Sequence, residues 1–181
     1  MNIRGLIRFA LLSALTLAVP AVAGPGNDTR VPMTNERVAQ LLGRLDLDAT
    51  GGNGLWSFDL AGRDVTIVTH EAADRMRIFT AVAAADALDE ESLRRVLQAN
   101  FDSALDARYA IAKGVLWSVF IHPLAALDDA ELLAGLGQVV NLANTFGGDY
   151  TSGLLLFGGG DSGGIREREL IDQLIEKGLA I

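Results

Sequence analysis

The sequence predicts an α+β fold: a five-stranded antiparallel sheet with helices, in the order helix, three strands, helix, two strands, helix. The first observation is a signature shared by three helix starts, in which an apolar residue precedes a capping side chain and another apolar residue follows one turn later. It occurs at 33–38, 88–93 and 127–132, and it is typical of an N-cap with a hydrophobic staple. The second observation is that the loops between the expected strands are too short for a parallel crossover.

The first 23 residues have the pattern of a secretory signal peptide. Arg4 and Arg8 form a basic start, residues 9–19 are apolar, and small residues precede an expected cleavage point after Ala23. The apolar run is short for about 30 Å of hydrocarbon, so an uncleaved membrane anchor is the weaker alternative. We therefore expect a periplasmic or secreted protein with no membrane insertion after cleavage.

The mature chain begins with an expected linker over 24–33, followed by a single domain over 34–157. Its first helix covers about 34–46, with apolar residues at helical spacing: Val38, Leu41, Leu42 and Leu45. A glycine-rich turn over 49–54 precedes three strands with alternating side chains. These strands are expected at 55–60, 65–70 and 75–80.

The second half of the domain predicts a helix, a hairpin and a longer helix. The helix over 89–101 has an apolar stripe, which consists of Leu93, Val96, Leu97 and Phe101. The hairpin strands 107–112 and 115–122 are joined by Lys113-Gly114, a two-residue loop with glycine where positive φ is needed. In the helix over 128–146, Gly135 and Gly137 each cost about 1 kcal/mol, so we expect close packing against a neighbour to compensate.

The strand over 115–122 is apolar on both faces. One face carries Val115, Trp117, Val119 and Ile121, and the other carries Leu116 and Phe120. Such a strand must be covered on both sides, by helices or by another protomer. We therefore predict that Leu116, Trp117 and Phe120 are binding residues.

The tail has a different composition from the domain. Residues 158–164 hold five glycines and read as a flexible linker. Residues 165–181 then predict an amphipathic helix, whose apolar side is formed by Leu170, Ile171, Leu174 and Ile175. Its other side mixes acidic and basic residues, which suits a groove on a protein better than a lipid surface.

Charge and cysteine content exclude several classes of function. The chain has a formal net charge of −8, and the expected cleavage removes two further positive charges. Binding to nucleic acid would need a basic face, so we expect no nucleic-acid partner, and adsorption to anionic lipid is disfavoured for the same reason. The chain contains no cysteine, which leaves no disulfide and no thiol chemistry.

Three short patterns could carry chemistry, and each has a simpler interpretation. Residues 160–164 spell the active-site string of trypsin-like proteases, with Ser162 as nucleophile, but neither histidine has the expected sequence context, and we interpret the string as part of the glycine-rich linker. Residues 46–51 match half of a calcium loop, yet its twelfth position is Ser57, where a glutamate is required. His70 and His122 are isolated, and a zinc site needs three or four converging ligands. We expect no catalytic residue, no metal and no cofactor.

Residues in two of the expected helices and three of the expected strands and turns resemble a known group. They are 55–58 at the start of the sheet, 96–101 at the end of the second helix, Leu116-Trp117, 122–124, and Leu127-Asp128. Together they resemble the type III secretion chaperone-like fold, which includes the Tir-chaperone and YbjN-like families, over about 34–147.

The resemblance implies a small acidic protein without a catalytic site, often a homodimer, that holds an extended partner segment on apolar patches and sheet edges. YbjN-like members are described as candidate regulators. Secretion chaperones act in the cytosol, whereas this chain starts with an export signal and adds a glycine-rich linker and a terminal helix. The resemblance therefore implies a binding mode and not a role in loading effectors.

We therefore expect a non-enzymatic, exported protein-binding module, chaperone-like or regulatory, with an unidentified protein partner and a possible homodimer. One alternative is a small-ligand-binding protein or hydrolase centred on the loop 149–152 and His122. Another alternative is a structural envelope component that docks through its C-terminal helix.

Overall fold

The computed structural model describes residues 31–152 and 163–180 of the 181-residue chain. The expected signal peptide, and most of the two expected linkers at 24–33 and 158–164, lie outside the described residues. Among the described helices, none is both long and apolar enough to cross a membrane.

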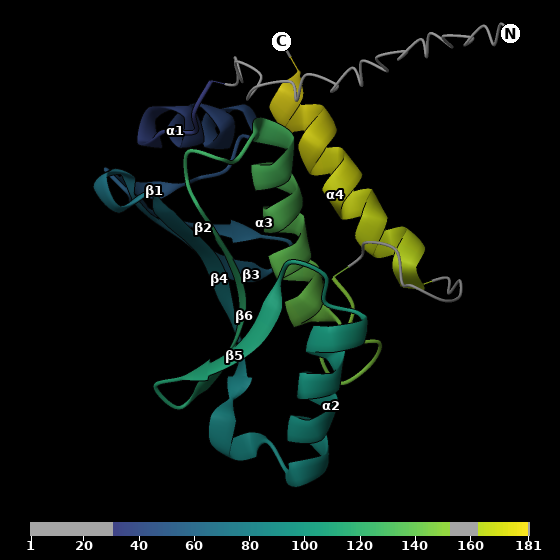
Figure 1. Cartoon of the computed structure of the whole chain (residues 1–181). Coiled ribbons are helices and arrows are strands. Elements are labelled where there is room, and N and C mark those ends of the chain that lie inside the picture. The colour runs from purple at the N-terminus through teal and green to yellow at the C-terminus, as the bar shows by residue number, and fades with distance from the viewer. Residues whose placement is uncertain (1–30, 153–162, 181) are drawn as a thin grey trace, which may run out of the picture.

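The described residues form four α-helices and a six-stranded sheet (Figure 1). The helices are α1 (Asn35–Arg44), α2 (Glu90–Asp102), α3 (Asp129–Asn144) and α4 (Gly163–Leu179). The strands are β1 (Thr50–Gly52), β2 (Leu55–Leu60), β3 (Arg63–His70), β4 (Arg75–Ala84), β5 (Arg108–Ala112) and β6 (Val115–His122). Short 3-10 turns at Glu71–Ala73 and Ala85–Ala87 flank β4.

The predicted helix starts are confirmed. The side chains of Thr34, Asp89 and Asp128 accept backbone N–H groups at the starts of α1, α2 and α3. At α3 the bond is reciprocated, because the carboxylate of Glu131 accepts the N–H of Asp128 at 2.8 Å. This capping box satisfies N–H groups that the first turn of a helix would otherwise leave unpaired.

The α+β class and the antiparallel sheet are confirmed, but the prediction of five strands is wrong. The extra strand is β1, which pairs with β2 through Thr50↔Ser57 and Gly52↔Leu55. Asn53 and Gly54 both adopt positive φ, at 50° and 94°, and this conformation lets a two-residue turn join right-twisted strands. The glycines therefore belong to a tight hairpin and not to an open loop.

The strands lie in the order β1-β2-β3-β4-β6-β5, and every neighbouring pair is antiparallel. The β5–β6 hairpin joins the meander through β6, which pairs with β4 along its whole length. A register shift between Ala81 and Ala83 marks a bulge in β4 at this junction. As a result β6 lies inside the sheet, with β4 on one side and β5 on the other.

The helices make two layers on one face of the sheet. Helix α3 packs against β4, β5 and β6, and α4 packs against the other side of α3 and against α1 (Figure 1). Because α3 lies between the sheet and α4, it is buried on nearly all sides, as expected for a helix that is apolar all round.

The glycines of α3 make close approach possible on both of its sides. A Cβ built on Gly135 would lie 3.1 Å from the ring of Phe120, and one on Gly137 would lie 2.5 Å from Cγ1 of Ile171 in α4. On the facing helix, a Cβ on Gly178 would lie 2.6 Å from Leu133. The expected close packing around the glycines is therefore confirmed, and it is reciprocal between α3 and α4.

Candidate binding surface

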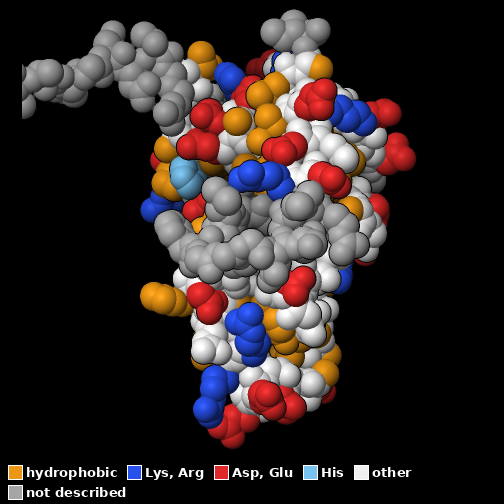
Figure 2. All heavy atoms as spheres, turned by 90° about the vertical axis from the view of Figure 1, so that its right-hand side faces the viewer, with side chains coloured by type: hydrophobic (Ala, Val, Ile, Leu, Met, Phe, Trp, Pro, Cys, Tyr) orange, Lys and Arg blue, Asp and Glu red, His pale blue; other side chains and the backbone are white. Residues whose placement is uncertain are grey.

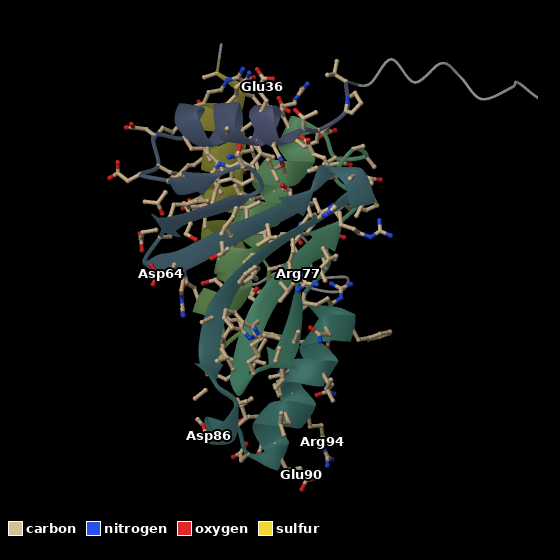
Figure 3. All side chains as sticks on the ribbon, turned by 90° about the vertical axis from the view of Figure 1, so that its left-hand side faces the viewer. Glu36, Asp64, Arg77, Asp86, Glu90 and Arg94 are labelled. Atoms are coloured by element: carbon tan, nitrogen blue, oxygen red, sulfur yellow. The ribbon has the colours of Figure 1, made fainter. Side chains whose placement is uncertain are left out.

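The sheet has one face that no described helix covers, and we call it the outer face. Successive side chains of a strand point to opposite faces, and along β6 they alternate between buried and partly exposed positions. The buried set packs towards α3, so the other set points away from the helices. Figure 3 looks onto the outer face and shows Arg77 near its middle and Asp64 at its edge.

The outer face carries a cluster of large apolar side chains from four strands. We call it the outer-face cluster, and its members are Leu55, Val68, Phe79, Trp117, Val119 and Ile121. Leu55 and Ile121 are 53% and 58% exposed. Isolated exposed apolar residues need no explanation, whereas a contiguous patch marks an interaction surface.

The strand register places members of the cluster in neighbouring rows across the sheet. Leu55 pairs with Val68 across β2 and β3, and Phe79 pairs with Val119 across β4 and β6. Directly paired residues have Cβ atoms about 4.5–5.5 Å apart, which is contact distance for large side chains. Arg77 lies in the first of these rows, where it stands between Val68 on one side and Ile121 on the other.

Trp117 is held in a fixed orientation on this face. Its ring meets the ring of Phe79 edge to face, with the centroids 5.5 Å apart. Its Nε1 donates a hydrogen bond to the carbonyl oxygen of Ala112 at 3.0 Å. Because the polar atom of the indole is already satisfied, the rest of the ring is available as a rigid apolar contact.

The three residues predicted from the sequence do not share a face. Leu116 and Phe120 are 0% and 5% exposed and lie on the inner face of the sheet, where Phe120 packs against Gly135 of α3. Trp117 is half-buried on the outer face. The inner apolar face of strand β6 is therefore covered within this chain, and its outer apolar face has no cover from a described helix.

One end of the outer face is basic. His70, Arg75 and Arg77 surround a groove of about 390 Å³, together with Val68, Phe79 and Ile121. We call the three polar residues the basic end. Within the described ranges, neither arginine makes an ion pair, and the only hydrogen bond of Arg75 goes to the neighbouring carbonyl of Asp74 at 3.0 Å.

A second exposed apolar surface lies on α2, where the sequence predicted a single apolar stripe. Val96 is buried, but Leu97 is 70% exposed and Phe101 is 96% exposed, with Leu93 beside them. The buried side of α2 consists of Val96 and the small residues Ala99 and Ser103. The four residues of the expected stripe therefore do not share one environment, because Val96 is buried and Leu93, Leu97 and Phe101 are exposed.

The second half of the loop 149–152 is packed into the structure, whereas Asp149 is exposed and Tyr150 lines a groove beside α2. Thr151 and Ser152 are 4% and 0% exposed, and the N–H of Ser152 donates to the carbonyl of Ser103 at 3.2 Å. Beside the loop, Arg95 lies 4.7 Å above the ring of Tyr150. The loop therefore packs the end of α3 against α2 and its C-terminal cap.

His122 lies too far from this loop to share a pocket with it. It lines a groove with Leu127 and Glu131 near the start of α3, whereas the loop follows the end of that helix. The groove of His122 extends along α3 as far as Gln138 and includes no residue of the loop, whereas the loop is held from Asn141, whose Nδ2 donates to the carbonyl of Ser152 at 3.1 Å. The two halves of the proposed hydrolase site therefore do not meet.

The remaining candidate sites have structural roles in the described part of the chain. His70 Nδ1 accepts the N–H of Ala73 at 3.0 Å, and the ring of His122 stacks on Phe120. Thr50 and Gly51 of the calcium-loop pattern belong to β1. The described residues contain no group of three or more His, Cys, Asp or Glu side chains that could hold a metal ion. Ser162 lies outside them.

A buried tyrosine near the same loop is also a packing residue. The hydroxyl of Tyr109 donates to the carbonyl oxygen of Leu142 at 2.7 Å, and its ring contacts those of Phe146 and Tyr150. Burial raises the pKa of Tyr109 well above its ordinary value, because the charged phenolate would lose its hydration. The neutral phenol stabilises the junction between β5 and α3.

Comparison with known proteins gives likenesses of fold. No protein-family model matches this chain, and no curated protein matches it in sequence. The Yersinia pestis type III secretion chaperone SycH, solved with a stable fragment of YscM2, is 14% identical, with a TM-score of 0.49 over 62% of this chain and 98% of its own. The ExsC–ExsE complex contains a chain that is 19% identical, with a TM-score of 0.48 over 69% of this chain and 95% of that one. A type III secretion chaperone is therefore among the solved structures similar to this chain, as the resemblance in sequence led us to expect.

Proposed function

We propose that this protein is a non-enzymatic, exported protein-binding module, chaperone-like or regulatory, that holds an extended segment of a partner protein on the outer face of its sheet. The observation that carries the proposal is the outer-face cluster. It places Trp117, Phe79 and Ile121 on a sheet face that no described helix covers.

The face suits a partner segment better than the free edge of β5 does. At that edge the side-chain amide of Asn100 in α2 pairs with the backbone of Tyr109, as a neighbouring strand would. Its oxygen accepts the N–H of Tyr109 at 2.7 Å, and its nitrogen donates to the carbonyl of the same residue at 3.1 Å. An added strand would have to displace these bonds. At the opposite edge, β1 is only three residues long.

Helix α4 does not offer its apolar side for docking to an envelope structure. Ile171 and Leu174 are buried against α3, and Lys177 Nζ donates to the carbonyl of Leu45 at 2.6 Å. The side that remains in solvent carries charged residues, and Figure 2 shows acidic and basic side chains along this part of the surface. Docking through α4 would therefore need the helix to leave α3 first.

Partner capture is tested by site-specific crosslinking. We would replace Ile121 with the photo-crosslinker p-benzoylphenylalanine, irradiate cells that produce the tagged chain, and identify the crosslinked proteins. Trp117→Ala in the same background should abolish the specific crosslink, whereas Leu97→Ala on α2 should leave it unchanged. A crosslink that survives Trp117→Ala at full yield would contradict the proposal.

We propose that self-association, where it occurs, uses the apolar stripe of α2. Leu93, Leu97 and Phe101 follow each other at intervals of four residues, so two antiparallel copies of the stripe can match about Leu97. Phe101→Asp should then give a monomer in light scattering coupled to gel filtration. A wild-type chain that is monomeric at about 100 μM, which corresponds to a dimerisation free energy weaker than about −5.5 kcal/mol, would contradict a stable homodimer.

We propose export to the periplasm with cleavage after Ala23, based on the signal pattern in the sequence. The mass of the protein purified from the periplasmic fraction tests both points. A mature chain that starts at Gly24 supports the proposal, and recovery of the full-length chain in the cytosol contradicts it.

A further inference from the structure

We propose that the basic end of the outer face selects the partner by charge: the bound segment is acidic at one end and apolar along the rest. This inference rests on the proposed function, because it describes the ligand of the same surface. His70 and Arg75 pair with each other where β3 meets β4, and Arg77 lies two residues further along β4, between Val68 and Ile121 of the outer-face cluster.

The two arginines are free to bind an external carboxylate. The nearest acids in sequence are already used, because Glu71 Oε1 accepts the N–H of Asn35 at 2.7 Å and Asp74 Oδ1 accepts the N–H of Ala125 at 2.7 Å. No residue in the described part of the chain pairs with the guanidinium of Arg77. An arginine beside apolar side chains and without a carboxylate partner favours a bidentate contact with an incoming one.

The spacing of the arginines matches an extended ligand. Arg75 and Arg77 are two residues apart on the same face of β4, which places them about 6.6 Å apart along the strand. Carboxylates on alternate residues of an extended peptide have the same spacing. The next outward residue of β4 is Phe79, so apolar residues should follow the acidic ones at alternate positions of the ligand.

The overall charge of the chain makes this end distinctive. The protein has a net charge of −8, so an acidic ligand is repelled by most of its surface and attracted where the arginines gather. Such an attraction between exposed groups is screened by salt, with a Debye length of about 10 Å at 0.1 M and about 3 Å at 1 M. Charge selection should therefore weaken as salt is added, while the apolar contacts remain.

The experiment uses two fluorescein-labelled peptides that differ only in charge. The acidic probe is Gly-Glu-Ser-Glu-Ser-Leu-Ser-Phe-Ser-Leu-Gly, and the basic probe has lysine in place of both glutamates. Binding to the full mature chain is measured by fluorescence anisotropy. We expect the acidic probe to bind at least about tenfold more tightly at low salt, a difference of about 1.4 kcal/mol, and we expect the preference to shrink at about 1 M salt.

Matched variants locate the preference on the chain. R75Q/R77Q should remove it, R75K/R77K should retain part of it because the positive charges remain, and R94Q on α2 should leave it unchanged. Circular dichroism confirms that each variant is folded. A preference that survives in R75Q/R77Q overturns the inference.

The remaining outcomes separate this inference from the proposed function. Equal binding of both probes, weakened in each case by Trp117→Ala, overturns charge selection and supports the outer face as the binding surface. Failure of both probes to bind the wild-type chain up to millimolar concentration overturns the two proposals together.

Discussion

The two faces of the sheet are built from the same strands but are treated differently by the rest of the chain. On the inner face, Ile67, Ile78 and Leu116 are fully buried because α3 packs over them. On the outer face, Val68 and Ile121 remain exposed although they are equally apolar. The comparison shows that an apolar strand pattern identifies faces that need burial against another surface. The described helices bury the inner face and leave the outer face exposed.

Strand β6 shows the contrast within eight residues. Its inward residues lie against α3, including Phe120 in the space that Gly135 leaves open. In the described part of the chain, its outward residues contact neighbouring residues of the sheet, as Trp117 contacts Phe79. The first set stabilises the fold, and the second set is available to another molecule.

The largest expected effect comes from a pair of substitutions on β6 that tests this contrast directly. Leu116→Ala on the inner face should lower the free energy of unfolding by about 2–5 kcal/mol, because it leaves a cavity under α3. Ile121→Ala on the outer face should change it by about 0.5 kcal/mol or less. Urea unfolding followed by circular dichroism measures both values. Similar losses at the two positions would mean that the outer face is also covered in solution.

A smaller effect, of opposite sign at two glycines, tests how the second helix layer is attached. Gly137→Ala should destabilise the protein by about 1–3 kcal/mol, because the new methyl group overlaps Ile171 of α4. Gly43→Ala in α1 meets no atom within 4 Å and should stabilise it by about 0.4–1 kcal/mol. Thermal unfolding gives the two shifts. Stabilisation by both substitutions would show that α4 does not pack on α3 as described.

A third prediction concerns the rigidity of the outer face. Phe79→Ala should cost about 0.5–1.5 kcal/mol through loss of the aromatic pair, and it should also weaken binding of the acidic probe because Trp117 loses its lateral support. The matched control is Leu97→Ala, which removes exposed apolar surface on α2, outside the outer-face cluster. Equal binding by the two variants would show that the orientation of Trp117 is unimportant.

The smallest expected effect lies outside both faces, at the start of α2. Asp89 accepts the N–H of Ser92, and this hydrogen bond lowers the pKa of its carboxyl group. Because the pKa is lower in the folded state, the ionised carboxylate stabilises the fold at pH values above the unfolded-state pKa of about 3.9. This stabilisation is lost as the pH falls through the folded-state pKa. The loss of stability below about pH 4 should therefore be shallower in Asp89→Asn than in the wild type. Asp86→Asn, an exposed acid three residues earlier, serves as the control, and the same slope in both variants would contradict the role of the cap.

Local features of this fold could be predicted from the sequence because their causes are local. The caps at Thr34, Asp89 and Asp128 depend on residues within one turn of the helix. The two-residue turn at Lys113-Gly114 requires positive φ at both positions, and both adopt it. Asn53-Gly54 is the same kind of two-residue turn signal, and it predicts a hairpin in which the residues before it form the additional strand β1.

The placement of apolar surfaces could not be predicted in the same way. The pattern of β6 shows two apolar faces, but which one α3 covers depends on packing between distant segments. On α2 the largest apolar residues were expected to form one stripe, whereas the structure brings the side with Ala99 and Ser103 against the core and leaves Phe101 outside. Small residues allow a helix to approach the core more closely. A sequence pattern based on large apolar residues does not predict which side of the helix makes that approach.

The amide of Asn100 has a consequence for how the chain behaves at high concentration. By occupying the hydrogen-bonding groups of Tyr109, it denies a second molecule the template from which a continuous sheet could grow. An added strand would therefore have to displace Asn100 at this part of the edge, which lowers the tendency of the chain to polymerise through β5 while the outer face remains accessible.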